Sequence, residues 1–271
     1  MSDTVAVLMA AYNAEKTICE SVASVLRSTH PFHLYIVDDC SWTPVADVLR
    51  PYDDTRIEII RLACNAGPAG ARNAGLQKIL RDGHNLVAIM DADDLCHPER
   101  FAKQAAYLAS HPGVAVVGCW EHIIDERSEY VSDVALPCDP AEIRKLLYLK
   151  MCMSHPTLMI RSEIFRMLGL YAERYRAGED YELVRRIAVG HDIANLPEYL
   201  LHYRLSKGGM SMSSRKRQLV DRLRVQLAYF HLLKWQAWAG VVRTLSLLIV
   251  PAKRAKPDTI SPERAKALQG T

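Results

Sequence analysis

Residues 86–94 have the sequence Leu-Val-Ala-Ile-Met-Asp-Ala-Asp-Asp, an apolar run that is followed at once by a cluster of carboxylates. A short, continuous apolar run of this kind is typical of a strand that is buried on both faces. Three earlier stretches, residues 5–9, 34–37 and 57–60, have the same character. They predict three more buried strands.

Helical patterns lie between these predicted strands, at residues 14–28, 44–52 and 70–81. Strands and helices that alternate along a chain build βαβ units. We therefore predict an α/β fold with a Rossmann-like, mainly parallel sheet that is flanked by helices.

The second half of the chain is less regular. Asp139-Pro-Ala-Glu142 predicts a helix start, because Asp suits the cap, Pro the first position and Glu the third. The other expected elements are helices at 98–110, 180–189 and 218–250, and strands at 114–117, 157–160 and 200–203. In the last helix the apolar side chains gather on one side, and they are Trp235, Trp238, Val242, Leu245 and Ile249.

Composition limits the classes of protein that fit. With 271 residues and 49% hydrophobic residues, the chain suits one α/β domain with an appendage, or two small domains. From Ser214 onward 12 Lys/Arg stand against 3 Asp/Glu, so this segment carries +9 and the remainder −6 of the net +3. A basic segment on an acidic body favours contact with an anionic surface.

The cysteines and the N-terminus indicate a compartment. Seven scattered cysteines without a CxxC pair argue against a disulfide framework and a structural zinc site. No signal peptide is visible at the N-terminus, and the longest apolar stretch, residues 237–250, is too short to span a bilayer comfortably. We therefore expect a cytoplasmic location.

Polar residues follow three of the predicted strands. Ala10-Ala-Tyr-Asn13 follows the first, Asp38-Asp39 ends the second, and Asp91-Ala-Asp-Asp94 ends the fourth. In a parallel α/β sheet the ligand crevice lies beyond the carboxyl ends of the strands. Since several carboxylates in one crevice repel each other, we expect a bound cation or a cationic partner there.

The Asp91-x-Asp93 pair is the sharpest of these features. One carboxylate can bind a hard divalent ion such as Mg²⁺ or Mn²⁺, while the other binds a metal-bound water or a ribose. An isolated pair of this kind is more often a solvated loop. Its place after an apolar strand, with Tyr12 and Asp39 at sister positions, favours a binding site.

Several ordered motifs carry a family resemblance, and they are residues 7–13, 36–41, 65–67, 71–75, 90–94, 154–157, 178–180 and 203–204. With them the chain resembles family 2 glycosyltransferases over roughly residues 3 to 210. The resemblance implies the GT-A fold and inverting transfer of a sugar from a nucleotide diphosphate donor, with a UDP-sugar favoured, to an acceptor hydroxyl. We expect a catalytic domain at 1–213, with a nucleotide-binding half at 1–117 and an acceptor-side half at 118–213, and a basic helical extension at 214–271.

The resemblance also implies roles for single residues. Asp39 would bind the nucleotide base, Tyr12 would lie against it, and Arg72 would reach the base or the Asp39 region. Asp91 would face the ribose and diphosphate, and Asp93 would ligate Mn²⁺ or Mg²⁺. Further donor contacts are expected from Ala11, Asn13, Ala92, Arg204 and Lys207. Two alternatives stay open: Tyr12 covering the sheet edge, and Arg72 pairing with Asp38 or Asp39.

The resemblance assigns the catalytic base to Asp180, with Glu179 beside it. Transfer needs the acceptor proton removed by a carboxylate within hydrogen-bond reach. A like charge next to Asp180 would raise its proton affinity, while a helix N-terminus would lower it. The sequence leaves this balance open, and an ordinary acidic helix start is the alternative interpretation.

One motif departs from the family pattern. Many members carry a His two residues after the Tyr-Arg pair, but here Leu205-Ser206 follow Tyr203-Arg204. Arg204 and Lys207, with a hinge at Gly208-Gly209, are the candidates to replace it. His202 is expected to be a packed strand residue. His155 is expected to make a structural hydrogen bond, and the alternative is that it borders the acceptor pocket.

The basic extension and the rival functions complete the predictions. The extension suits the inner membrane surface, where a saccharide or lipid-linked saccharide acceptor would lie, or else packs on the domain or in a homodimer. No nucleic-acid motif is present. A dinucleotide dehydrogenase would need a G-x-G-x-x-G motif after its first strand, and this chain has Ala10-Ala-Tyr-Asn13 there instead. A nucleotidyltransferase of similar fold and a non-enzymatic membrane adaptor are the remaining alternatives.

Overall fold

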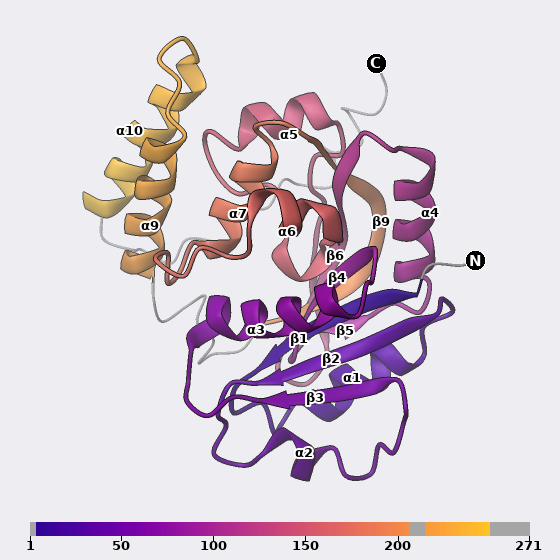
Figure 1. Ribbon diagram of the computed structural model, residues 1–271. Coiled ribbons are helices and arrows are strands. Elements are labelled where there is room, and N and C mark those ends of the chain that lie inside the picture. The colour runs from indigo at the N-terminus through magenta and orange to yellow at the C-terminus, as the bar shows by residue number, and fades with distance from the viewer. Residues whose placement is uncertain (1–3, 206–214, 250–271) are drawn as a thin grey trace.

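The computed structural model describes residues 4–205 and 215–249, and it shows a 9-stranded sheet with helices on both sides (Figure 1). The strand order is β3-β2-β1-β4-β8-β6-β9-β5, with β7 paired to β6. The strands are β1 Val5–Ala11, β2 Phe32–Asp38, β3 Ile57–Arg61, β4 Leu86–Asp91, β5 Leu95–Cys96, β6 Val114–Ile124, β7 Tyr130–Val134, β8 Met159–Arg161 and β9 Asp192–Arg204. The predicted α/β class is confirmed.

The first four strands form the parallel half of the sheet, as predicted. Side chains of β1 alternate between two core clusters. Ala6 and Leu8 pack on one face of the sheet, while Val5, Val7 and Met9 pack on the other. Because both faces are covered, β1 and β4 are apolar over nearly their whole length, whereas the edge strand β3 carries Glu58 and Arg61.

The helices surround this sheet. They are α1 Ile18–Leu26, α2 Val45–Val48, α3 Gly67–Arg81, α4 Arg100–Ser110, α5 Pro140–Leu146, α6 Ser162–Leu168, α7 Glu179–Ile187, α9 Arg215–Ala228 and α10 Trp235–Ile249, with a short 3-10 helix at His155–Thr157. The predicted cap of α5 is confirmed, because Asp139 Oδ1 accepts from the Glu142 N–H at 2.8 Å.

Helix α3 lies unusually close to the sheet. A Cβ added at Gly75 would stand 2.4 Å from Leu8 Cδ1 and 2.8 Å from Val37 Cγ2. Side-chain atoms cannot approach so closely, so only glycine lets α3 settle on β1 and β2. This close contact sets the distance between α3 and the sheet.

The second half of the chain extends the same sheet further than predicted. β6 and β9 are 11 and 13 residues long and pair in parallel, although only four residues of each were expected to be strand. β8 starts at Met159 rather than at residue 157, because residues 155–157 form the 3-10 turn. α2 is also shorter than predicted.

The predicted helix at 218–250 is two helices. α9 and α10 are separated by residues 229–234 and form a helical hairpin beside the body (Figure 1). The predicted apolar side of α10 faces outward, with exposed fractions between 42% and 81%. The predicted domain boundary at 213/214 lies outside the described residues. No helix within residues 4–205 and 215–249 is long and apolar enough to cross a membrane.

Candidate active site

A cavity of about 340 Å³ lies beyond the carboxyl end of β4. Its lining includes four carboxylic acids, Asp91, Glu121, Glu179 and Asp180, together with the Arg72 guanidinium. The acids come from β4, β6 and the start of α7, which are far apart in sequence. Asp91 lies there as the strand-end argument predicts, and Glu179 and Asp180 lie there as the family resemblance implies. Asp39 and Asp93, which were expected in the same crevice, do not line this cavity.

Arg72 holds two of these acids together. Its Nη2 donates to Asp91 Oδ1 at 2.9 Å, and its Nη1 donates to Glu179 Oε1 at 3.1 Å. The guanidinium is buried, and its carbon lies 5.9 Å from the centre of the Tyr171 ring. The alternative of a pair with Asp38 or Asp39 is wrong, because those acids bind other donors. Arg72 thus links the motif at Asp91 to the motif at Glu179.

Glu179 and Asp180 begin α7 directly after Gly178. Burial raises the pKa of both carboxyls, and repulsion by Asp180 adds to the rise for Glu179. For Asp180, the Tyr181 N–H at 2.6 Å and the Arg72 charge oppose the rise without cancelling it. The balance that the sequence left open therefore falls toward higher proton affinity.

Glu121 belongs to the cavity, and the sequence argument missed it. The residue lies in the middle of β6, where no motif marks it, and its Oε2 accepts from the Ser154 Oγ–H at 2.6 Å. Burial raises the pKa of this carboxyl to about 7, while the Ser154 hydrogen bond and Arg100 partly oppose the rise. The only signal in the sequence was an acidic residue within an otherwise apolar run.

Glu121 should make the protein less stable as the pH rises. Since its pKa is raised in the folded state, the native protein binds more protons than the unfolded chain between the two pKa values. The Glu121→Gln variant should therefore lose less stability than the parent between pH 5 and 7.5, by on the order of 2–3 kcal/mol. Urea denaturation at both pH values measures this. Equal losses in the two proteins would show that Glu121 is ionised throughout.

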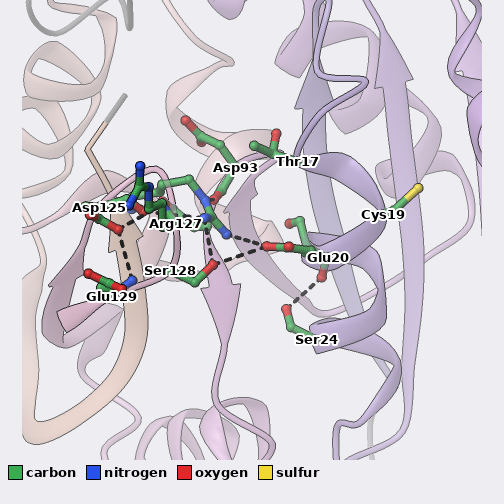
Figure 2. A network of polar contacts seen from close by, with 12 residues as sticks. Thr17, Cys19, Glu20, Ser24, Asp93, Asp125, Arg127, Ser128 and Glu129 are labelled. Carbon is green, nitrogen blue, oxygen red and sulfur yellow. Dashed lines mark hydrogen bonds and ion pairs between the residues drawn. The ribbon is translucent and has the colours of Figure 1, made fainter. Parts of the chain in front are cut away.

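The Asp93-Asp94 pair and Arg204 belong to one network of polar contacts. Figure 2 shows Asp93, Glu20 and Ser128 of this network close together. Arg204 Nε donates to the Asp93 carbonyl at 2.8 Å, and its backbone N–H donates to Asp94 Oδ1 at 2.9 Å. The Arg204 guanidinium also donates to Glu20 and Ser128, so it is buried in the network. In this structure Arg204 positions the Asp93 loop and does not line the cavity.

Asp94 is the most buried acid at this strand end. Burial, together with repulsion from Asp91 and Asp93, raises its pKa well above the usual range. Its Oδ2 has no hydrogen-bond partner among the described residues. Three neighbouring carboxyls with one orphaned oxygen are a chemical setting that a divalent cation would relieve.

The described residues do not form a complete metal cage. No group of three or more His, Cys, Asp or Glu side chains converges in a way that could hold an ion, as far as residues 4–205 and 215–249 show. Mg²⁺ and Mn²⁺ suit a site with one or two protein carboxylates and phosphate oxygens. Asp93 therefore fits as a metal ligand only in the company of a phosphate-bearing donor.

The acids after β2 lie in another part of the strand edge. Asp38 accepts from the Ser41 and Val45 N–H groups and pairs with Arg61, so its role is structural. Asp39 is buried and accepts from the Ala66 and Gly67 N–H groups at 2.7 and 3.0 Å. Burial raises the pKa of Asp39 although these two bonds oppose the rise. Asp39 does not line the cavity, and its contact with a base stays a prediction.

The loop after β1 holds Tyr12 and Asn13. Asn13 has a positive φ of 51°, and its Oδ1 accepts from the Trp42 N–H at 3.0 Å. Tyr12 is 49% exposed, so its ring is not committed to the core. Ala11, which precedes Tyr12, and Ala92, which follows Asp91, are both buried. Lys207, with the Gly208-Gly209 hinge, lies outside the described residues.

His202 has a structural position, as predicted, while His155 is hydrogen-bonded and also lines the cavity. His155 Nε2 lies 2.9 Å from the Tyr171 hydroxyl, and burial lowers its pKa to about 3, so the ring is neutral. His202 is a strand residue whose ring centre lies 5.3 Å from that of His122. Burial lowers the pKa of His202 as well.

Comparison with known proteins decides the family. Residues 6–169 match the model of the family described as "Glycosyl transferase family 2". The chain belongs to glycosyltransferase family 2. It is 34% identical over 223 residues to the amylovoran biosynthesis glycosyltransferase AmsE of Erwinia amylovora, with 78% of this chain and 79% of AmsE covered. It is 29% identical over 214 residues to the O-antigen biosynthesis glycosyltransferase WbnJ of Escherichia coli, with 75% of this chain and 80% of WbnJ covered.

Solved structures show the same fold. The crystal structure of S. aureus TarS 1-349 in complex with UDP-GlcNAc superposes with a TM-score of 0.71 at 18% identity, covering 89% of this chain and 71% of that chain. The GT-A fold predicted from sequence is thereby confirmed. Membership of family 2 decides against the dehydrogenase, nucleotidyltransferase and adaptor alternatives for this glycosyltransferase.

Proposed function

We propose that this glycosyltransferase moves a sugar from a nucleotide diphosphate donor, a UDP-sugar being favoured, onto a hydroxyl of a saccharide or lipid-linked saccharide. The names of AmsE and WbnJ, both polysaccharide-assembly enzymes, support a role in surface polysaccharide synthesis. The UDP-GlcNAc complex of TarS supports the nucleotide-sugar donor. We propose a cytoplasmic location at the inner face of the membrane.

The observation that carries this proposal is the Arg72 bridge. It fixes Asp91, at the end of β4, and Glu179, at the start of α7, on one cavity wall. Asp180 follows Glu179 and lines the same cavity. A donor bound near Asp91 would therefore lie within reach of a carboxylate that can take the acceptor proton.

The proposed chemistry is a direct displacement with inversion at the anomeric carbon. Asp180 accepts the proton of the attacking acceptor hydroxyl, and no covalent nucleophile is required. Asp93 would hold Mn²⁺ or Mg²⁺, which supplies charge stabilisation for the departing diphosphate. Tyr12 and Asp39 would bind the nucleotide base, with Asn13 beside them.

A donor panel tests this proposal. With Mn²⁺ or Mg²⁺ present, the protein should release nucleoside diphosphate from a UDP-sugar, whereas a nucleotidyltransferase would release pyrophosphate. Replacing Asp93 by Ala should reduce release by at least about a hundredfold, because the cation loses its protein ligand. Asp192→Ala is the matched control, since Asp192 is a half-exposed acid paired with Arg144 far from the cavity. Full release by Asp93→Ala would remove the metal assignment.

A further inference from the structure

Helix α10 carries an exposed apolar strip. Trp235, Trp238, Val242, Leu245 and Ile249 are spaced by three and four residues, so they form one line along the helix. Their exposed fractions lie between 42% and 81%, and the loop residues Leu232 and Leu233 beside them are 73% and 89% exposed. A continuous apolar surface of this kind marks an interaction site.

The opposite side of α10 already packs on this chain. Ala237, Gly240 and Thr244 are buried, and a Cβ added at Gly240 would lie 1.9 Å from the Tyr148 carbonyl oxygen. Gln226 of α9 donates to the Tyr148 carbonyl at 3.2 Å. The hairpin is therefore seated by one face, and none of the residues in 4–205 and 215–249 covers the strip on the other face.

The charges around the strip indicate what covers it. Between residues 215 and 249 the only acid is Asp221, which is buried and accepts from the Ala177 N–H at 3.1 Å. The cationic residues of this segment are Arg215, Lys216, Arg217, Arg222, Arg224, Lys234 and Arg243. Two copies facing each other here would bring like charges together, whereas anionic lipid headgroups would complement them.

We propose that the α9–α10 hairpin docks on an anionic lipid bilayer, with the strip of α10 in the headgroup region and the exposed Lys216, Arg217 and Lys234 against lipid phosphates. A helix that lies in the interface has an apolar face of this kind and a cationic border. Trp side chains favour that depth, since one edge is apolar and the indole N–H is polar. The purpose of docking rests on the proposed function: Gln218 of α9 lines the cavity, so a lipid-borne acceptor would arrive close to it.

Vesicle flotation with the full chain tests the docking surface. The protein should float with phosphatidylcholine vesicles that contain phosphatidylglycerol, should bind pure phosphatidylcholine vesicles much less, and should dissociate at high salt. The double variant Val242→Ser/Leu245→Ser should bind roughly tenfold or more weakly, because two apolar anchors are lost. Lys216→Glu/Arg217→Glu should weaken binding only to the anionic vesicles.

Controls separate the outcomes. Met167→Ser removes a similarly exposed apolar side chain on α6 and should bind vesicles like the parent. Diphosphate release in a vesicle-free assay should be the same in Val242→Ser/Leu245→Ser as in the parent, so failure of the proposed function is seen independently. Equal flotation of the parent and this double variant would overturn the proposal. The proposal would also be overturned, in favour of a second copy, if the parent sedimented as a dimer without binding vesicles and Val242→Ser/Leu245→Ser sedimented as a monomer.

Discussion

Replacement of Asp180 by Asn should reduce sugar transfer by about 10²- to 10⁴-fold, because the amide cannot accept the acceptor proton. The side chain lines the cavity at the start of α7, next to the Glu179 that Arg72 holds. The substitution keeps the shape of the side chain and leaves the Asp91 side of the cavity unchanged. Donor binding, measured by calorimetry with the UDP-sugar, should therefore be retained.

If Asp180 is the base as proposed, the pH dependence of transfer should follow its ionisation. A base works when ionised, and burial raises the pKa of Asp180 above the usual range of an aspartate. Transfer should therefore fall off at a higher pH on the acid side than an exposed aspartate would give. Glu163→Gln is the control, since Glu163 is an exposed acid in the first turn of α6. Normal turnover by Asp180→Asn would transfer the role to another carboxyl.

Replacement of Arg72 by Ala should lower the free energy of unfolding by about 3–5 kcal/mol, because it leaves two acids on the cavity wall without their cation. Asp91 and Glu179 would then repel each other. Glu179 would bind its proton more tightly in the folded state, because the Arg72 charge that opposes the rise of its pKa would be gone, so the loss should shrink as the pH is lowered. Urea denaturation across a pH series measures both effects.

An exposed ion pair provides the matched comparison for Arg72. Arg144 pairs with Asp192 at 2.6 Å, with both side chains about half exposed. Its replacement by Ala should cost less than about 1 kcal/mol, because solvent screens such a pair. If Arg72→Ala cost no more than Arg144→Ala, or if its cost did not depend on pH, the bridge would not hold the cavity together.

Local sequence patterns predicted the strands that are buried on both faces. The strands at residues 5–9, 34–37 and 86–90 are apolar along their length because both faces are covered, and a run of that kind is readable from sequence. β6 was underestimated because Gly118, Glu121 and His122 interrupt its apolar character. Its length comes from pairing with β9, about 80 residues later, which no local pattern reports.

For the candidate site, the sequence predicted several acids but not the contacts between them. Acids after two strands and the acidic start of α7 were found, because strand ends and helix starts are visible in sequence. The partners of Arg72 were not, since Glu179 is 107 residues away and only the fold brings it near. The periodicity of α10 predicted one apolar side, but not that this side faces outward.

Gly75 connects the middle of α3 to the chemistry at its beginning. Arg72 lies three residues before Gly75, on the same face of the helix, so the height that glycine permits also sets where the guanidinium meets Asp91 and Glu179. In a mutational library over this helix, substitutions at Gly75 should therefore inactivate the protein, although Gly75 does not line the cavity. Directed evolution of donor scope is better confined to cavity side chains such as Ser154 and Gln218.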